Sequence, residues 1–229
     1  MNSKLPYTVS LNLYRKLSFG KFKSWYCGLV KKAPPIPPYS HIIQTGDPAL
    51  RVVSEQVPNN LVHTPEIKFL MQRLKSVFER YGCVGLSACQ IGIPLRIIIV
   101  EFNNNHMKQY SAEECKHKEI QVLPQTILVN PELRVLDYTK ITHTEGCESV
   151  RGFIADVPRY RSVEIKGANE NGEEIILNAN GWISRIFQHE LDHLNGKLYT
   201  DIMDRKTFSC SCWEIVNEKG GKVELPFSP

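Results

Sequence analysis

Three absences limit what this 229-residue chain can be. No apolar run approaches the roughly 20 residues that a membrane-spanning helix needs, so we expect no membrane insertion. The seven cysteines are odd in number and irregularly spaced, and no secretory apolar segment stands near the start. These features exclude a disulfide-built secreted domain and indicate a reducing compartment. Acidic residues are absent before Asp47, which divides the chain into two segments of different charge.

The acid-poor segment carries seven basic residues together with hydroxyl and apolar side chains. This composition is typical of a mitochondrial transit peptide, and the proline-rich residues 34–38 form a stiff boundary. We therefore expect residues 1–39 to be a transit peptide with its linker and residues 40–229 to be the catalytic domain. A basic arm that contacts RNA or anionic lipid, and a plastid address, are the alternatives. Without those seven, 21 basic residues face 24 acidic ones. The net charge of +4 thus comes from the leader, and it gives no reason to expect direct nucleic-acid binding.

The sequence His189-Glu190-Leu191-Asp192-His193 is the strongest chemical motif of the chain. Two histidines four residues apart share one face of a helix and can bind one metal ion. Asn180 as N-cap and Gly196 as stop predict a helix between them. At about 100° per residue its apolar side chains form one arc, with Glu190 near the middle. The polar side chains expected on the opposite side are Arg185, Gln188 and Asp192.

The position of Glu190 favours a chemical role. A carboxylate that faces the core is costly unless it is paired or functional. Burial would also raise its pKa, which suits a group that accepts and returns a proton near neutral pH.

The third ligand of such a metal site has to come from elsewhere, because hydrolytic centres commonly have three protein ligands and one open position. The extended protease motif H-E-x-x-H-x-x-G-x-x-H fits at Gly196, but Tyr199 stands where its third histidine would be. A glutamate from the short, glycine-interrupted tail is a weaker alternative. Cys147 follows Gly146, which permits a tight approach of the backbone, although a lone cysteine is also often a small buried hydrophobe.

Three blocks occur in order along the chain: residues 84–90 (VGLSACQ), residues 145–149 (EGCES) and residues 188–193 (QHELDH). This order resembles the peptide deformylase family, whose signatures read G-x-G-L-A/S-A-x-Q, E-G-C-x-S and H-E-x-D-H. Flanking matches extend the resemblance over about residues 40–208. Cys83 stands at the first glycine of the first signature, and Glu148 follows the cysteine where bacterial members usually carry leucine. Both departures resemble the animal mitochondrial branch of the family.

The resemblance implies a metal-dependent hydrolase that removes the formyl group from the N-terminal formyl-methionine of newly made organellar proteins and releases formate. Cys147, His189 and His193 would hold one divalent ion per chain, Fe²⁺ or Zn²⁺, for which Co²⁺ can substitute. The implied partners are N-formylmethionyl peptides and nascent chains, and relatives of the animal type also suggest a homodimer. The implied location is the mitochondrial matrix.

Catalytic roles follow from the same resemblance. Glu190 would take a proton from water and deliver it to the leaving amine. The side-chain amide of Gln90 and the backbone N–H of Glu148 would stabilise the oxyanion. An extended peptide would pair with the glycine-containing segment of the first block. The substrate-binding residues expected on this basis are Val84, Gly85, Leu86 and Gly146.

The fold implied is α+β, with antiparallel sheets packed around a central metal-binding helix. The residue patterns also predict a mixture of helices and strands. Thr64 and Pro65 begin a helix that continues to about Tyr81. Strands are expected at residues 95–100, 127–130, 133–142, 162–166 and 173–178, and a surface loop at residues 103–118.

Two other functions remain open at this point: a metallopeptidase that uses the HExxH helix, and a non-catalytic peptide-binding protein of the same fold. Among the remaining cysteines, Cys83 and Cys89 are expected to be packing residues. Cys210-Ser211-Cys212 has too short a spacing, and no partner pair, for a zinc clip.

Overall fold

The structure, a computed structural model, describes residues 35–229. The predictions made for residues 1–34, including most of the transit peptide, lie outside the described residues. Within the described part, no helix is both long and apolar enough to span a membrane.

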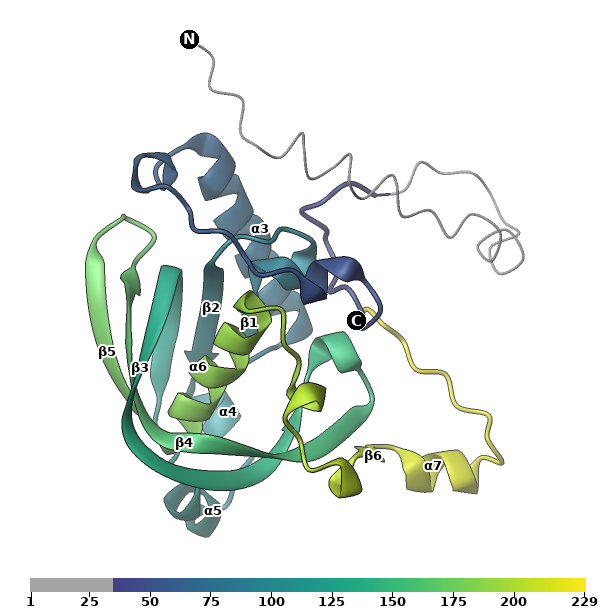
Figure 1. Ribbon diagram of the computed structural model, residues 1–229. Helices are drawn as coiled ribbons and strands as arrows, with labels where there is room; N and C mark the ends of the chain where they lie inside the picture. The colour runs from purple at the N-terminus through teal and green to yellow at the C-terminus, as the bar shows by residue number, and fades with distance from the viewer. Residues whose placement is uncertain (1–34) are drawn as a thin grey trace. The chain divides into compact units, whose positions relative to one another are not determined.

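One antiparallel sheet forms the framework of the described chain (Figure 1). Its strand order is β1-β2-β3-β4-β5, and the short β6 pairs with the start of β4. Each strand of the main path therefore lies beside its neighbour in sequence. The strands are β1 (Gly85–Ser87), β2 (Ile97–Phe102), β3 (Leu123–Gly146), β4 (Phe153–Ala168), β5 (Glu174–Asn180) and β6 (Ser209–Cys210).

The strands β3 and β4 are long and bend around helix α6 (Gly181–Leu194) (Figure 1). Residues 127–130 and 133–142, expected as two strands, belong to the single strand β3, because irregularities near Asn130 bend the strand without ending its pairing with β4. All six strands are thus joined in one sheet. The α+β class with a helix among antiparallel strands is confirmed.

Helix α6 begins and ends close to its predicted limits. Asn180 occupies the N-cap position in an extended conformation, without a side-chain cap hydrogen bond, and Gly196 follows the helix with a φ of +70°. The apolar arc lies in the core, as predicted, against β2, β4 and β5. Its members are Ile183, Ile186, Phe187, Leu191 and Leu194.

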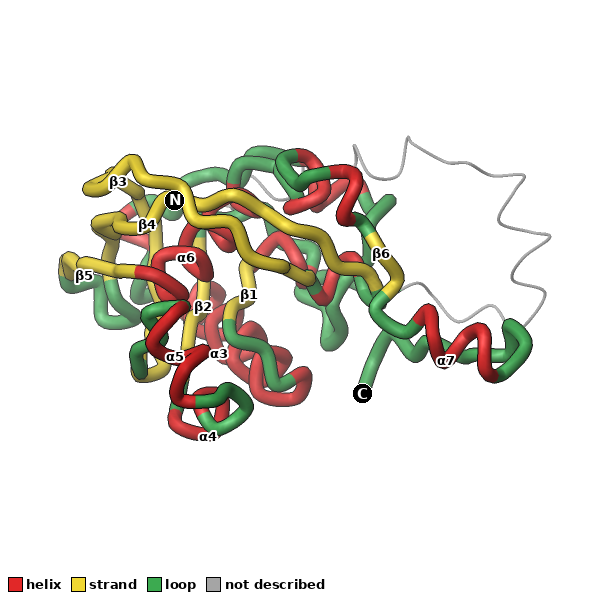
Figure 2. Tube along the Cα trace, turned by 90° about the horizontal axis from the view of Figure 1, so that it is seen from below, coloured by secondary structure: helices red, strands yellow, loops and turns green. Residues whose placement is uncertain are grey.

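The opposite side of α6 differs from the prediction. Arg185 and Gln188 were expected to face solvent, but both are buried. The reason is the length of β3 and β4, which reach past the core and cover this side of the helix (Figure 2).

Helix α3 (Pro65–Tyr81) has the predicted bounds, and it packs against β1 and β2. Thr64 is at the N-cap position, but its hydroxyl donates to the Leu61 carbonyl instead of capping the helix. Gly82 ends the helix in the left-handed conformation, with a φ of +63°.

The predicted loop at residues 103–118 contains two short helices, α4 (Asn104–Met107) and α5 (Ala112–His117). Each begins with a capping box, on Asn103 and Ser111 respectively, a short signal that the polar composition obscured. The last helix is α7 (Trp213–Glu218). The 3₁₀ helices are η1 (Pro48–Arg51), η2 (Asn59–Leu61), η3 (Ala88–Ile91), η4 (Glu148–Val150), η5 (Tyr199–Asp201) and η6 (Arg205–Thr207).

Candidate active site

The three predicted metal ligands converge. The ligand atoms of Cys147, His189 and His193 all lie within 4.8 Å of one another, and Cys147 Sγ is 3.3 Å from His193 Nε2. The histidines come from successive turns of α6, and Cys147 comes from the point where β3 ends and η4 begins. A thiolate and two imidazoles at this spacing fit one zinc, iron or cobalt ion with a further position for water.

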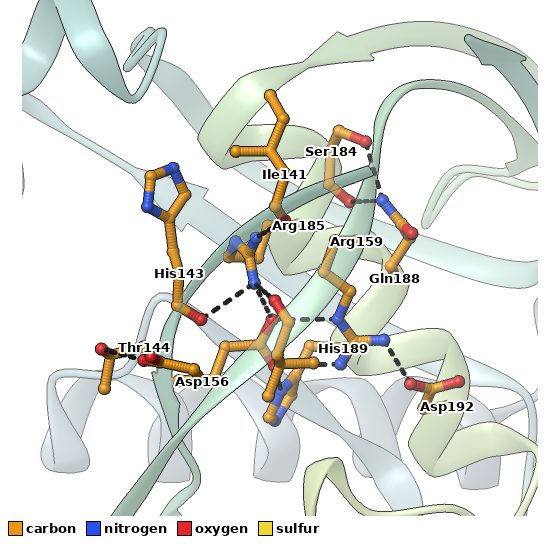
Figure 3. Close-up of polar contacts among 12 residues, drawn as sticks. Ile141, His143, Thr144, Asp156, Arg159, Ser184, Arg185, Gln188, His189 and Asp192 are labelled. Carbon is orange, nitrogen blue, oxygen red and sulfur yellow. Dashed lines mark hydrogen bonds and ion pairs between the residues drawn. The ribbon is translucent and has the colours of Figure 1, made fainter. Parts of the chain in front are cut away.

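The orientation of His189 is set by Glu145. His189 Nδ1 lies 3.0 Å from Glu145 Oε2, which leaves Nε2 to face the ligand cluster. Arg159 donates two hydrogen bonds of 2.9 Å to the same carboxylate, and Arg185 donates one of 2.6 Å (Figure 3). Arg159 also pairs with Asp192, on the next turn of α6.

These charges are buried but paired. The side chains of Glu145, Arg159 and Arg185 are each about 5% exposed. Burial alone would raise the pKa of Glu145, but hydrogen bonds from His189 and Arg159 outweigh it and hold the pKa well below its usual range. Glu145 is therefore an ionised acceptor that fixes the imidazole of a ligand.

Arg185 and Gln188 join α6 to the long strands. Arg185 donates to the backbone carbonyls of Ile141 in β3, at 2.6 Å, and Val157 in β4, at 2.8 Å (Figure 3). Gln188 exchanges two hydrogen bonds with the backbone of Tyr160, at 2.8 and 2.9 Å. The polar side of the helix thus satisfies backbone groups of the sheet that covers it.

Glu190 faces the interior, as predicted, with 3% of its surface exposed. Burial raises the pKa of its carboxyl group. Ser87 Oγ donates a hydrogen bond of 2.6 Å to Glu190 Oε2. A Cβ atom on Gly85 would lie 2.4 Å from Glu190 Oε1, so only glycine leaves room for the carboxylate at this point of β1.

Gln90 presents the amino end of its side-chain amide to the site. Its Oε1 accepts a hydrogen bond from the Ser87 N–H at 2.8 Å, which fixes the direction of the amide. Its Nε2 lies 3.1 Å from Ser149 Oγ and 3.7 Å from Cys147 Sγ. A donor thus stands beside the metal-ligand cluster, where an oxyanion donor is needed.

A cavity of about 400 Å³ adjoins these groups. Val84, Gly85 and Gly146 line it, whereas Leu86 is fully buried and does not. Only the backbone of Leu86 could therefore contact a peptide. The other predicted site residues that line the cavity are Gln90, Cys147, Glu148, His189 and Glu190; His193 lies behind them and is 1% exposed.

Three residues in the site were not assigned from the sequence: Glu145, Ser87 and Tyr199. Glu145 and Ser87 stand within the first two motif blocks, and this position was the signal that could have pointed to them. The order of residues within a block does not show which atoms of another block they contact. Tyr199 stacks on His189, with ring centroids 6.4 Å apart, and its hydroxyl donates to the Phe153 carbonyl at 2.9 Å. Its ring therefore supports a ligand, while its hydroxyl is bound to the backbone and stands outside the ligand cluster.

Comparisons with known proteins agree with this geometry. The sequence model of the polypeptide deformylase family matches residues 39–209. The mitochondrial peptide deformylase of Homo sapiens is 44% identical over 185 residues, which are 81% of this chain and 76% of that protein. Peptide deformylase 1A, chloroplastic/mitochondrial, of Arabidopsis thaliana is 36% identical over 184 residues, which are 80% of this chain and 68% of that protein.

Solved structures are similar as well. The class I type b peptide deformylase of Acinetobacter baumannii with bound Met-Ala-Ser has a TM-score of 0.62 at 26% identity, covering 71% of this chain and 96% of that one. The peptide deformylase of Synechococcus elongatus in complex with actinonin has a TM-score of 0.60 at 27% identity, covering 85% and 93%.

Proposed function

This chain belongs to the polypeptide deformylase family, and we propose that the convergent residues of its cavity carry out the family's reaction. The chain is a hydrolase that removes the formyl group from N-formylmethionyl peptides. The observation that carries the assignment of residues is the buried Glu190 carboxylate, which lines the same cavity as Cys147 and His189, two of the three clustered ligands. A metallopeptidase is not favoured, because its ligand set has no need of Cys147.

Cys147, His189 and His193 hold one divalent ion per chain, which is Fe²⁺ or Zn²⁺, with Co²⁺ as a substitute. When bound, the ion polarises the formyl oxygen and lowers the pKa of a water molecule from about 15.7 toward 7. Glu145 keeps His189 in the tautomer that offers Nε2.

Glu190 transfers the proton. Its carboxylate takes the proton of the attacking water and delivers it to the leaving amine, so that formate and a free N-terminus result. Ser87 and the space left by Gly85 hold the carboxylate in place during both steps.

Gln90 and Glu148 stabilise the negative charge that develops on the formyl oxygen. Gln90 contributes its Nε2–H, and Glu148 contributes its backbone N–H from the first residue of η4. Removal of one such donor typically lowers the rate about 10²- to 10³-fold.

The peptide binds along β1. This strand is at the edge of the sheet, and its first residue Gly85, the preceding Val84 and Gly146 all line the cavity. An extended chain can add to such an edge through backbone hydrogen bonds. The partners are nascent N-formylmethionyl chains, bound without direct contact to nucleic acid, and the expected homodimer is tested by light scattering.

The protein acts in the mitochondrial matrix. The acid-poor basic leader and the mitochondrial relative support this location. A fusion of residues 1–40 to a reporter is expected to enter mitochondria, and a reporter that stays in the cytosol contradicts the proposal.

Formate release from a formyl-Met-Ala-Ser peptide tests the catalytic assignment. Full-length protein is purified without oxygen and loaded with iron, zinc or cobalt. Glu190→Gln keeps the shape of the side chain but cannot take up a proton in the same way, so the rate should fall about 10²- to 10⁴-fold while the metal content stays at one ion per chain. Glu170→Gln, on the surface, is the matched control. The proposal fails if the wild type releases no formate with any of the three metals, or if Glu190→Gln is as fast.

A further inference from the structure

The segment at residues 209–212 forms part of the rim of the cavity. Strand β6 pairs with the first residues of β4, with Cys210 opposite Phe153. Ser211 donates to the Gly152 carbonyl from its backbone N–H, at 2.9 Å, and from its hydroxyl, at 3.2 Å. Gly152, Phe153 and Ser211 all line the cavity. The position of this short segment therefore bears directly on the shape of the peptide site.

Two thiols flank Ser211 and face each other. The Sγ atoms of Cys210 and Cys212 are 3.5 Å apart, and both side chains are free and half-buried. Cys83 and Cys89, in contrast, are buried packing residues, as the sequence predicts. Within residues 35–229, the one cluster with three metal-ligand atoms is that of Cys147, so the pair at residues 210 and 212 is not part of a metal site.

We propose that Cys210 and Cys212 are an oxidation site, a dithiol that oxidised glutathione or a similar small disulfide converts to an internal disulfide, with weaker peptide binding as the result. A disulfide bond is about 2.05 Å long, so the two sulfur atoms have to approach by about 1.5 Å. The short distance already present and the access to solvent make this pair the favoured site of such a reaction among the described cysteines.

The reaction is a pair of thiol–disulfide exchanges. The Cys210 thiolate attacks one sulfur of oxidised glutathione, the sulfur–sulfur bond breaks, and one glutathione leaves as a thiolate. The Cys212 thiolate then attacks the Cys210 sulfur and expels the second glutathione. The two cysteines are oxidised, the glutathione disulfide is reduced, and the two thiol protons pass to the two glutathione molecules.

Formation of the disulfide changes the cavity through Gly152 and Phe153. When Cys212 moves toward Cys210, the turn at Ser211 tightens, and the hydrogen bonds of Ser211 pull on Gly152. Leu225 packs against the other side of Gly152, so the glycine cannot follow without a shift of the tail. A shift of Gly152 and Phe153 changes the rim against which the peptide lies. If the peptide loses one or two hydrogen bonds to the backbone there, its binding weakens about three- to tenfold.

Mass spectrometry and peptide binding test the two parts of the proposal. The full-length, zinc-loaded protein is equilibrated in glutathione buffers of increasing oxidised fraction and then alkylated. The tryptic peptide of residues 207–219 contains both cysteines and no others. It should lose two hydrogen atoms and escape alkylation, and the Kd for the tripeptide Met-Ala-Ser, measured by calorimetry, should rise about three- to tenfold over the same buffers. The double variant Cys210→Ser/Cys212→Ser, which has no thiol left in this segment, should show neither change, and Cys115→Ser should behave as the wild type.

The outcomes separate this inference from the function on which it rests. Double alkylation of the peptide at every glutathione ratio overturns the oxidation site. A disulfide that forms while the Kd stays equal to that of the treated double variant Cys210→Ser/Cys212→Ser overturns its effect on the cleft. A reduced protein that binds no tripeptide contradicts the proposed peptide cleft, whereas the mass of residues 207–219 still decides whether the dithiol is oxidised.

Discussion

Helix α6 is held on its two sides by opposite kinds of chemistry. On the side of β3 and β4, His189 is oriented by the ionised Glu145, which is itself paired with two arginines. On the side of β1 and η3, Glu190 meets neutral groups, the Ser87 hydroxyl and the backbone of Gly85. We call these the ionic side and the neutral side of the site.

The difference follows from what each residue has to do. A ligand imidazole needs one fixed tautomer, and a carboxylate on its far nitrogen provides it. A proton-transferring carboxylate has to exist in both forms, and burial among neutral groups keeps its protonated form accessible. Burial raises the pKa of Glu190, and His189, the Ser87 hydroxyl and the more distant Arg159 offset this only in part.

The largest expected effect comes from breaking the ionic side. Glu145→Gln leaves Arg159 and Arg185 buried without a carboxylate, so the free energy of unfolding should fall by about 3–5 kcal/mol. Metal affinity should fall about 10- to 100-fold, because His189 loses its orienting partner. Urea denaturation and metal analysis measure the two effects. Glu164→Gln, which removes an exposed pair with Arg134, is the control and should leave both unchanged. A Glu145→Gln protein as stable as this control would show that the buried network contributes little.

The neutral side is tested next by filling the space at Gly85. The Cβ atom of Gly85→Ala would displace the Glu190 carboxylate, and a misplacement of about 1 Å can lower kcat about 100-fold. Metal content and unfolding should change little, because the added Cβ atom meets Glu190 and none of the three ligands. Gly220→Ala, where an added Cβ meets no atom within 4 Å, should keep full activity. Normal kcat in Gly85→Ala would contradict the role given to this glycine.

A smaller loss is expected from Ser87→Ala. This change removes the hydroxyl that donates to Glu190 Oε2, and a hydrogen bond to a charged group of this strength corresponds to about a tenfold loss in kcat. The KM for the formylated peptide should stay the same. Ser184→Ala is a matched control, because Ser184 is equally buried but donates to the Tyr160 carbonyl, away from Glu190. If both variants lose kcat equally, Ser87 has only a structural role.

The smallest effect is expected from Tyr199→Phe, on the ionic side. The ring that stacks on His189 remains, and only the hydrogen bond to the Phe153 carbonyl is lost. Unfolding should become easier by about 1 kcal/mol, with unchanged kcat and metal content. A loss of metal in this variant would mean that the hydroxyl, and not the ring, supports His189.

Much of the site could be predicted because its residues stand in short motifs. Two histidines at helical spacing indicate a shared face, and Glu190 on the apolar arc indicates burial; both features hold in the structure. Arg185 and Gln188 illustrate the limit of this reasoning. Helical periodicity describes one helix and its single core face, and it carries no information about strands more than 20 residues away that cover the other face.

The loop expected at residues 103–118 shows a second limit. Its polar composition suggested irregular structure, yet Asn103 and Ser111 each begin a short helix through a capping box. Helices of one or two turns depend on such local hydrogen bonds and on packing, and their average composition does not reveal them.

The sequence by itself determined the family, the ligand types and the helix that bears two of them, because these depend on residue identity and on spacing within one element. Only the tertiary structure decided that Glu145 orients His189, that Ser87 and Gly85 position Glu190, and that Ser211, between Cys210 and Cys212, lines the cavity beside Gly152. Each of these contacts joins elements far apart in the chain. Their geometry is set by how β3 and β4 bend around α6, which results from packing and hydrogen bonding across the whole sheet.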